Sequence, residues 1–384
     1  MTPKWMEEQP KLKQCLLDIV LSFKRCQCDE SNDTSLQILD FAEKMLTTIA
    51  WSTASDVIKK LREIGWYLST SVPQEVPIAN VVRRILFIIR EEVLLATKSN
   101  TASCSDDAKS LLESKECIGR SQCSLETLLT PGSVTNLSLS TAELKMSIME
   151  GIRELRDEIQ NSQLNISDQA IEFIHTEYAM QTFDNSRAYG KLFFSEVILS
   201  FGMCSYLEAF FQAAAKKRQF KVIVVESAPS LNGHALAHQL ALNGIDVTVI
   251  PDTAVFAIMA RVNKVIIPAY AVLADGGLIA QSGLHNIVLA AKNFSIPVIC
   301  ITSLITLCPL YAHDVDTKNE LGNPSQIFDH QDVTDKMAIL NPTRDYVPPS
   351  LVDLYVTNIG AHQASHIYRL QAEYYSSDDH DLAK

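Results

Sequence analysis

The sequence has few of the features that mark nucleic-acid-binding, membrane or secreted proteins. Acidic residues outnumber basic ones by 45 to 33, and the net charge is −12. That balance argues against broad contact with nucleic acid or anionic membranes, because both need clustered positive charge. No apolar run reaches the ~18 residues of a membrane helix, and the polar start Met1–Lys13 predicts no secretory signal. We therefore expect a cytoplasmic chain without direct nucleic-acid or membrane contacts.

Paired cysteines and metal-binding clusters are also lacking. The nine cysteines are scattered and form no C-x-x-C pair, which argues against a disulfide framework and a zinc ribbon and suits a reducing compartment. His234 and His238, like His362 and His366, have the i, i+4 spacing that places two imidazoles on one helical face. Neither pair has the Glu of H-E-x-x-H or an obvious third ligand. We expect no metal, and partly buried or interface histidines instead.

The common phosphate-binding and hydrolase motifs are absent. G-x-G-x-x-G, G-x-x-x-x-G-K and G-x-S-x-G do not occur, which weakens a dinucleotide, triphosphate or serine-hydrolase interpretation. We therefore expect no cofactor.

Five short apolar runs rich in β-branched residues dominate the second half of the chain, and the gaps between them have helical patterns. Runs without polar alternation are typical of strands buried on both faces of a parallel sheet. The pattern predicts a doubly wound, mostly parallel, Rossmann-like sheet. The predicted strands are Glu196–Phe201, Lys221–Glu226, Asp246–Ile250, Lys264–Ala269 and Pro297–Thr302, and the predicted helices are Ser205–Arg218, Gly233–Asn243, Thr253–Arg261 and Gly283–Asn293.

The rest of the chain predicts a helical region and a connector. Residues 1–98 contain four apolar stripes at helical spacing, which indicate an N-terminal helical bundle that either docks a protein or only packs. Residues 99–140, rich in Ser, Thr and Asn, predict a flexible linker or insertion. Residues 141–194 predict connecting helices, the second capped by Ser167. Residues 195–384 would form the Rossmann-like domain, with a last strand beginning at Leu351 and a closing helix over Ala361–Tyr375.

The loops after the strands are where an open α/β sheet binds ligands. The two candidate loops, Glu226–His234 and Pro268–Gly283, contain neither Lys nor Arg. Their carboxylates, Glu226 and Asp275, are explained by a strand end and a turn before two glycines. Residues 303–345 predict a long insertion on one rim of the sheet. These loops alone indicate a ligand-binding fold with a chemically poor pocket.

The same loops resemble a known family. From about Ser195 the chain is similar to the isomerases of methylthioribose-1-phosphate and to their relatives, the regulatory alpha, beta and delta subunits of eukaryotic translation initiation factor 2B. The likeness to the beta members is the strongest. The segments VIVVESAPSLNGHALAHQ, ADGGLIAQSGLHN and DYVPPSLVDLYVTNIG carry it. The resemblance implies an isomerase-like fold.

The residues that give the isomerases their activity are replaced in this sequence. Gly202 stands in the place of the nucleophilic cysteine, with Cys204 two residues away; Ala228 replaces an arginine and Tyr270 the acid–base aspartate. Ala280-Gln281 replaces an Asn-Lys pair. Losing a cooperating set of this kind costs orders of magnitude in rate. The resemblance thus predicts a degenerate, non-catalytic pocket formed by Gly202, Ala228, Asn232, Gly233, Tyr270, Asp275 and Gly283.

The resemblance implies a non-catalytic regulatory subunit of the guanine-nucleotide exchange factor for initiation factor 2. Its partners would be the alpha, delta, gamma and epsilon subunits and the alpha subunit of initiation factor 2, whose phosphorylation it would sense. The predicted subunit interface on the closing helix consists of His362, His366, Ile367, Tyr368 and Leu370. Two alternatives remain: an active isomerase, which would need a cysteine and an aspartate at positions 202 and 270, and a small-molecule sensor.

Overall fold

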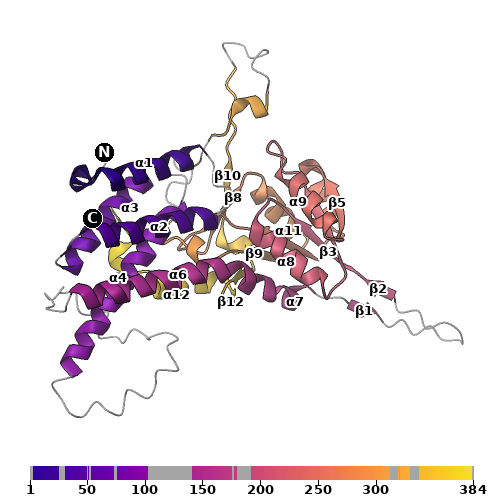
Figure 1. Ribbon diagram of the computed structural model, residues 1–384. Helices are drawn as coiled ribbons and strands as arrows, with labels where there is room; N and C mark the ends of the chain where they lie inside the picture. The colour runs from indigo at the N-terminus through magenta and orange to yellow at the C-terminus, as the bar shows by residue number, and fades with distance from the viewer. Residues whose placement is uncertain are drawn as a thin grey trace, which may run out of the picture. The chain divides into compact units, whose positions relative to one another are not determined.

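The chain forms two compact units (Figure 1), residues 1–158 together with 369–384 and residues 159–368, called here the helical unit and the α/β unit. These boundaries differ from those expected at residues 98, 140 and 194, because the last part of the chain packs with the N-terminal helices. The computed structural model describes residues 3–25, 31–49, 51, 53–72, 76–102, 141–174, 177–179, 192–311, 319, 321–328 and 337–382.

The helical unit confirms the four predicted N-terminal helices. Their apolar stripes are the buried faces: Leu16 and Leu61, for example, are 0% and 2% exposed. The hydroxyl of Thr53 caps one helix by accepting from the Asp56 N–H. The elements are η1 (Lys4–Glu8), α1 (Pro10–Lys24), α2 (Ser31–Thr48), α3 (Ala54–Ser71) and α4 (Val76–Ala102).

The predicted Ser167 cap is wrong, although a helix break does occur two residues later, at Gln169. Helix α6 runs without interruption over Thr141–Asp168, and only the short α7 (Ala170–Phe173) follows it. The Ser167 hydroxyl donates to the Leu164 carbonyl at 2.8 Å, back into its own helix, rather than capping a new one. Before this helix, α4 continues to Ala102, past the predicted boundary at residue 98. Most of the predicted linker, residues 103–140, lies outside the described residues.

In the described part of the α/β unit, the main sheet has seven strands in the order β12-β11-β9-β6-β3-β4-β5, parallel except for β12. This confirms the predicted fold and its five strands. Alternate strand residues such as Ile198 and Val222 share a core with Phe210 and Leu236 of the helices. The strands are β3 (Glu196–Ser200), β4 (Phe220–Val225), β5 (Asp246–Ile250), β6 (Lys264–Pro268), β9 (Val298–Ile301), β11 (Leu354–Thr357) and β12 (Gly360–His362), and the helices are α8 (Ser205–Ala215), α9 (Asn232–Leu242), α10 (Val255–Met259, after η2, Asp252–Ala254) and α11 (Leu284–Asn293).

Strand β5 departs from the prediction of burial on both faces. It is the edge strand, with β4 as its neighbour on one side. Only its last residue, Ile250, is buried, while Val249 is 45% exposed. An apolar run therefore marked a strand correctly but did not distinguish a central strand from an edge.

A second, antiparallel sheet was missed by sequence analysis. It has the order β10-β8-β7, with β7 (Ala271–Val272), β8 (Leu278–Gln281) and β10 (Arg344–Val347). Two of these strands lie in the predicted loop Pro268–Gly283, and the third lies in the predicted insertion and the residues just after it. Strands this short, paired across about sixty residues of chain, leave no periodic pattern. The described elements also include the pair β1 (Glu177–Ala179) and β2 (Leu192–Phe194), η3 (Leu304–Thr306) and η5 (Pro324–Gln326).

The end of the chain is less helical than predicted. The last parallel strand begins at Leu354, after η7 (Pro349–Leu351), and the closing helix α12 covers only Ile367–Tyr374. His362 lies in β12 and His366 in η8 (Ala364–His366), so the predicted shared helical face is wrong. The short η9 (Ser377–Asp379) follows α12. Among the described helices, none combines the length and apolar character that crossing a bilayer requires.

Candidate functional site

The candidate site lies at the carboxyl ends of β3 and β6, where the strand order reverses. From β3 the chain continues outward through β4 and β5 on one side and returns through β6, β9 and β11 on the other. In open α/β sheets, ligands bind in the crevice at this switch point. The loop after β3 contains Gly202, and the loop after β6 contains Tyr270.

Gly202 lies beside Gln281 and beside Pro268, the first residue of the loop that contains Tyr270. Its φ of +79° is a left-handed conformation that favours glycine. A Cβ added there would lie 3.4 Å from Gln281 Oε1 and 3.5 Å from Pro268 Cγ. The fold therefore brings the positions matching the nucleophile, the acid–base loop and the Asn-Lys pair together.

The loop after β4 closes one side of this site. The N–H groups of Ser227 and Ala228 donate to the Asp252 carboxylate at 3.2 and 2.7 Å. Ser230 Oγ accepts from Gln281 Nε2 at 2.7 Å. Asn232 is exposed at the first position of α9, and Gly233 is buried behind it. Backbone and side-chain polar groups of the loop thus bond to the protein itself.

The start of α11 already holds a carboxylate. Asp345 Oδ2 accepts from the Gly283 N–H at 2.7 Å and from the His285 N–H at 3.4 Å. A helix start is the natural position for an anion, because its N–H groups and dipole point outward. Here the chain's own Asp345 fills that position, which would otherwise suit a ligand phosphate.

Arg344 is a cation that sequence analysis missed. Its guanidinium carbon lies 3.3 Å from the centre of the Tyr270 ring, and Arg344 pairs with Gln281 across the β10–β8 ladder. The strand-end loops themselves contain no cation, but β10 brings Arg344 against Tyr270 of one of them. The sequence feature that could have indicated this cation is the pair Arg344-Asp345 directly before Tyr346-Val347, at the end of the segment that was interpreted as an insertion.

Asp275 forms the turn that the sequence predicted. Its Oδ1 accepts from the Gly277 N–H at 2.8 Å, and its Oδ2 accepts from the Tyr346 hydroxyl at 2.7 Å. Burial, followed by the hydrogen bond and charge of Asp275, raises the pKa of Tyr346 above its ordinary value. Burial also raises the pKa of the Cys300 thiol, with a smaller contribution from Cys204. These groups stay protonated near neutral pH and supply no base or nucleophile.

The predicted histidine and interface residues are distributed differently from expectation. His234 and His238 are on α9 as predicted, and both are exposed. Within the described ranges, no group of three metal-binding side chains lies close together. Of the predicted interface, Tyr368 is 62% exposed and His366 is exposed, whereas Ile367 and Leu370 are buried within the chain at 0% and 7% exposure.

A more apolar exposed surface lies on α10 and α11. Phe256 is 58% exposed, Leu289 47% and Phe294 37%, and the rings of Phe256 and Phe294 are 5.2 Å apart. Phe256 and Leu289 line a hollow of about 400 Å³ together with residues such as Asp252 and Asn286. We call this surface the α10–α11 hollow.

Comparison with known proteins gives consistent matches. The Initiation factor 2 subunit family matches residues 27–364. The chain is 39% identical over 354 residues to translation initiation factor eIF2B subunit beta of Dictyostelium discoideum, covering 86% of this chain and 87% of that protein. It is 32% identical over 368 residues to the protein of the same name from Schizosaccharomyces pombe, covering 88% and 89%.

Solved structures agree with the fold. The crystal structure of eIF2B beta from Chaetomium thermophilum gives a TM-score of 0.70 at 26% identity, covering 98% of this chain and 96% of that one. A chain of the tetrameric eIF2B-beta2-delta2 complex from C. thermophilum gives 0.68 at 24%, covering 96% and 97%. The 5-methylthioribose 1-phosphate isomerase from Pyrococcus horikoshii gives 0.55 at 14%, covering 94% and 87%, and shares the fold.

Proposed function

Because this chain belongs to the initiation factor 2 subunit family, we propose that it is a non-catalytic regulatory subunit of the guanine-nucleotide exchange factor for translation initiation factor 2. The observation that carries the proposal is the 39% and 32% identity, over most of the chain, to proteins named eIF2B subunit beta. Its partners would be the alpha, delta, gamma and epsilon subunits. It would also contact the alpha subunit of initiation factor 2 and respond to phosphorylation of that subunit.

The geometry of the pocket supports a structural, non-catalytic role for this chain. Gly202 and Gln281 meet at the site, but neither is the nucleophile or the lysine that the isomerases use there. Tyr270 lies under Arg344 instead of offering a carboxylate. Asp345 fills the helix start that a phosphate would use. The fold of the isomerases is retained, while the nucleophile and lysine, the acid–base carboxylate and the free phosphate position that the isomerase reaction requires are each absent from these positions.

We assign subunit assembly to the α/β unit. The α10–α11 hollow exposes two aromatic rings and a leucine, and aromatic side chains in a recess are typical anchors of protein interfaces. The occupant we propose is the α/β unit of a related subunit, and the relative solved as a beta2-delta2 complex supports this choice. The surface predicted from sequence, on which Tyr368 and His366 are exposed, is the competing position.

Co-purification with tagged delta subunit separates the two positions. Phe256→Asp and Tyr368→Asp each place a charge on one surface, and Leu242→Asp on α9, where Leu242 is 71% exposed, is the control. Loss of co-purification in Phe256→Asp alone supports the hollow. Loss in Tyr368→Asp alone supports the predicted surface instead. Normal recovery of all three variants would contradict assembly through either surface.

The function itself is tested by rebuilding the exchange complex. We expect that complexes of the other four subunits release GDP from initiation factor 2 more slowly without this chain, and that inhibition by the phosphorylated alpha subunit weakens. Adding the purified chain should restore both. A complex that exchanges GDP and responds to phosphorylation equally well without the chain would overturn the proposal.

Arg344 gives the small-molecule alternative one specific observation. The Arg344 guanidinium lies over the Tyr270 ring, in the strand paired with Gln281, and could bind an anionic group of a sugar phosphate or nucleotide. Calorimetric titration of these compounds into the chain and into Arg344→Ala tests it. Binding that disappears in the variant supports a sensor, and absence of binding to the unaltered chain rejects it.

A further inference from the structure

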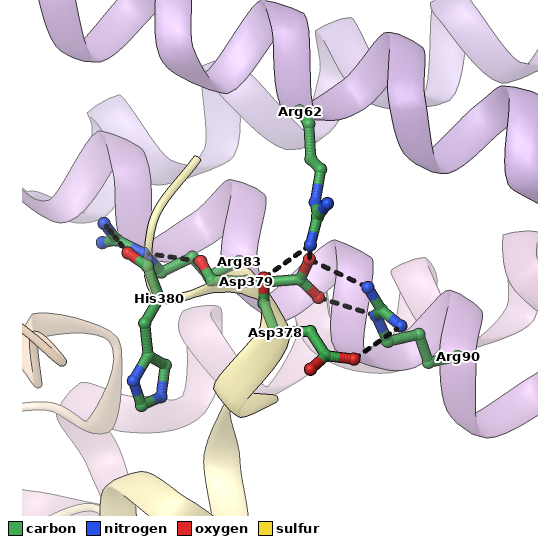
Figure 2. A network of polar contacts seen from close by, with 6 residues as sticks. All are labelled: Arg62, Arg83, Arg90, Asp378, Asp379 and His380. Atoms are coloured by element: carbon green, nitrogen blue, oxygen red, sulfur yellow. Dashed lines mark hydrogen bonds and ion pairs between the residues drawn. The ribbon is translucent and has the colours of Figure 1, made fainter. Parts of the chain in front are cut away.

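Asp379, near the end of the chain, is a fully buried carboxylate held by two arginines of the helical unit. Its side chain is 0% exposed. Arg62 of α3 places Nε and Nη2 at 2.8 and 2.7 Å from Oδ1, and Arg90 of α4 places Nε at 2.8 Å from Oδ2. Figure 2 shows the carboxylate between the two guanidinium groups. A buried carboxylate is stable only when it is paired in this way.

Two further arginines of α4 bind the backbone of the same segment. Arg83, itself 4% exposed, donates from Nε to the Asp379 carbonyl at 3.3 Å and from Nη2 to the His380 carbonyl at 3.1 Å. Arg84 donates to the Tyr374 carbonyl at 3.1 Å, and its guanidinium carbon lies 4.0 Å from the centre of the Tyr374 ring. The segment Tyr374–Leu382 is therefore recognised in the way that a protein binds a separate peptide.

The segment is held by these contacts and by its buried Tyr374 and Tyr375, which are 8% and 2% exposed, whereas its own regular secondary structure is limited. Beyond the last residue of α12 it contains only the three-residue η9. Asp378 is 60% exposed and Ser377 is exposed, while Leu382 is buried close to Gly65 of α3. A segment with so little helix or strand structure can leave its site while the elements around it stay folded, and such segments open at lower free energy than core helices.

We propose that Tyr374–Leu382 is a latch: it docks on and leaves the arginine-bearing face of α3 and α4 while the rest of the helical unit stays folded. Asp379 is the group that holds it closed. The unlatched state exposes the positive charges of Arg62, Arg83 and Arg90 and releases an acidic segment. The helical unit thus has two states that differ in surface charge, and a partner that binds either one shifts the balance between them.

Hydrogen exchange followed by mass spectrometry on the full chain tests the latch, with Asp379→Asn and Asp378→Asn as a matched pair. Both variants remove one negative charge from neighbouring residues. Asp379→Asn leaves two arginines without their buried partner, so exchange in the segment should accelerate on the order of a hundredfold. Asp378→Asn loses one contact of 3.4 Å on an exposed side chain, and exchange should stay unchanged. Peptides from α1 and α2 should not respond to either substitution.

A milder variant keeps the proposal falsifiable if Asp379→Asn unfolds. Arg90→Lys retains the charge but loses the geometry of several N–H donors, and we expect about tenfold faster exchange in the segment. Exchange that is unchanged in this variant would overturn the latch. So would a segment that, in the unaltered chain, exchanges at the same rate as α3, because it would then open only with the whole helical unit.

Discussion

Among the described glycines, Gly233 is the one at which an added side chain would meet the closest contact. A Cβ at this position would lie 1.9 Å from the carbonyl oxygen of Val225, which is backbone and has no rotamer to change. We expect Gly233→Ala to lower the free energy of unfolding by about 3 kcal/mol, at the upper end of overpacking. Urea unfolding followed by circular dichroism measures it. Gly244→Ala is the control, since no atom lies within 4 Å and only the strain of φ +80° remains, about 1 kcal/mol. Equal losses in both would show that crowding at Val225 has no effect.

The replaced residues at positions 202, 228, 270 and 281 predict that the chain is catalytically inactive. We expect the purified protein to convert methylthioribose-1-phosphate at the background rate, because the members of a catalytic set act together. A coupled assay beside an authentic isomerase measures it. Turnover at even about a thousandth of the authentic rate would contradict the proposal, since single losses in such sets already cost that much.

Residues near each other in sequence were predicted well, and distant ones were not. The Asp275 turn was predicted because its partner, Gly277, is two residues away. Arg344 was missed because its contact with Tyr270 depends on pairing between β8 and β10, which no local pattern reveals. The same holds for Asp379, which lies 317 residues after Arg62 and whose partners no local pattern indicated.

At the scale of elements, the start of helix α11 is capped by a carboxylate from strand β10. Asp345, in β10, accepts from the Gly283 and His285 N–H groups. We expect Asp345→Ala to destabilise the α/β unit by about 1–2 kcal/mol, the usual cost of losing a charged cap. Thermal unfolding measures it. Asp246→Ala is the control, because Asp246 pairs with Lys221 at an exposed site and should cost under about 1 kcal/mol. A control as damaging as Asp345→Ala would refute the cap.

Helices and strands with a sustained hydrophobic pattern were predicted, and elements that depend on tertiary contacts were not. A helix that buries one face needs an apolar stripe, which is the pattern found in α1 to α4. A strand that buries both faces needs a continuous apolar run, which is the pattern found in β3, β4, β6 and β9. The closing helix was predicted too long because apolar residues around His362 pack in a short antiparallel strand instead. The cap predicted at Ser167 was wrong because a serine hydroxyl can either cap a helix or bond to a carbonyl within one, and the sequence does not distinguish the two.

At the scale of the molecule, His380 makes the helical unit sensitive to pH. Burial, and then the charge of Arg83, lower the pKa of His380 below its ordinary value of 6.5, while Asp379 and Asp378 act in the opposite direction. The folded state thus favours the neutral imidazole. The stabilisation is complete above the unfolded pKa and is lost as pH falls from there toward the lower folded value. We expect Tyr374–Leu382 to be less protected against exchange at about pH 5.5 than at about pH 7.5, once the rates are corrected for the intrinsic pH dependence of amide exchange. His380→Gln should remove this difference, and a variant that keeps it would assign the effect to another group.

The pairing of Asp379 with Arg62 and Arg90 also has a consequence in time. Arg90 and Asp379 are 289 residues apart, so α4 is synthesised well before the carboxylate that pairs with it. At about 5–20 residues per second, a ribosome needs roughly 15–60 s to cover that distance. During this interval the arginines of α3 and α4 have no carboxylate, and the nascent chain presents them to any acidic surface it meets.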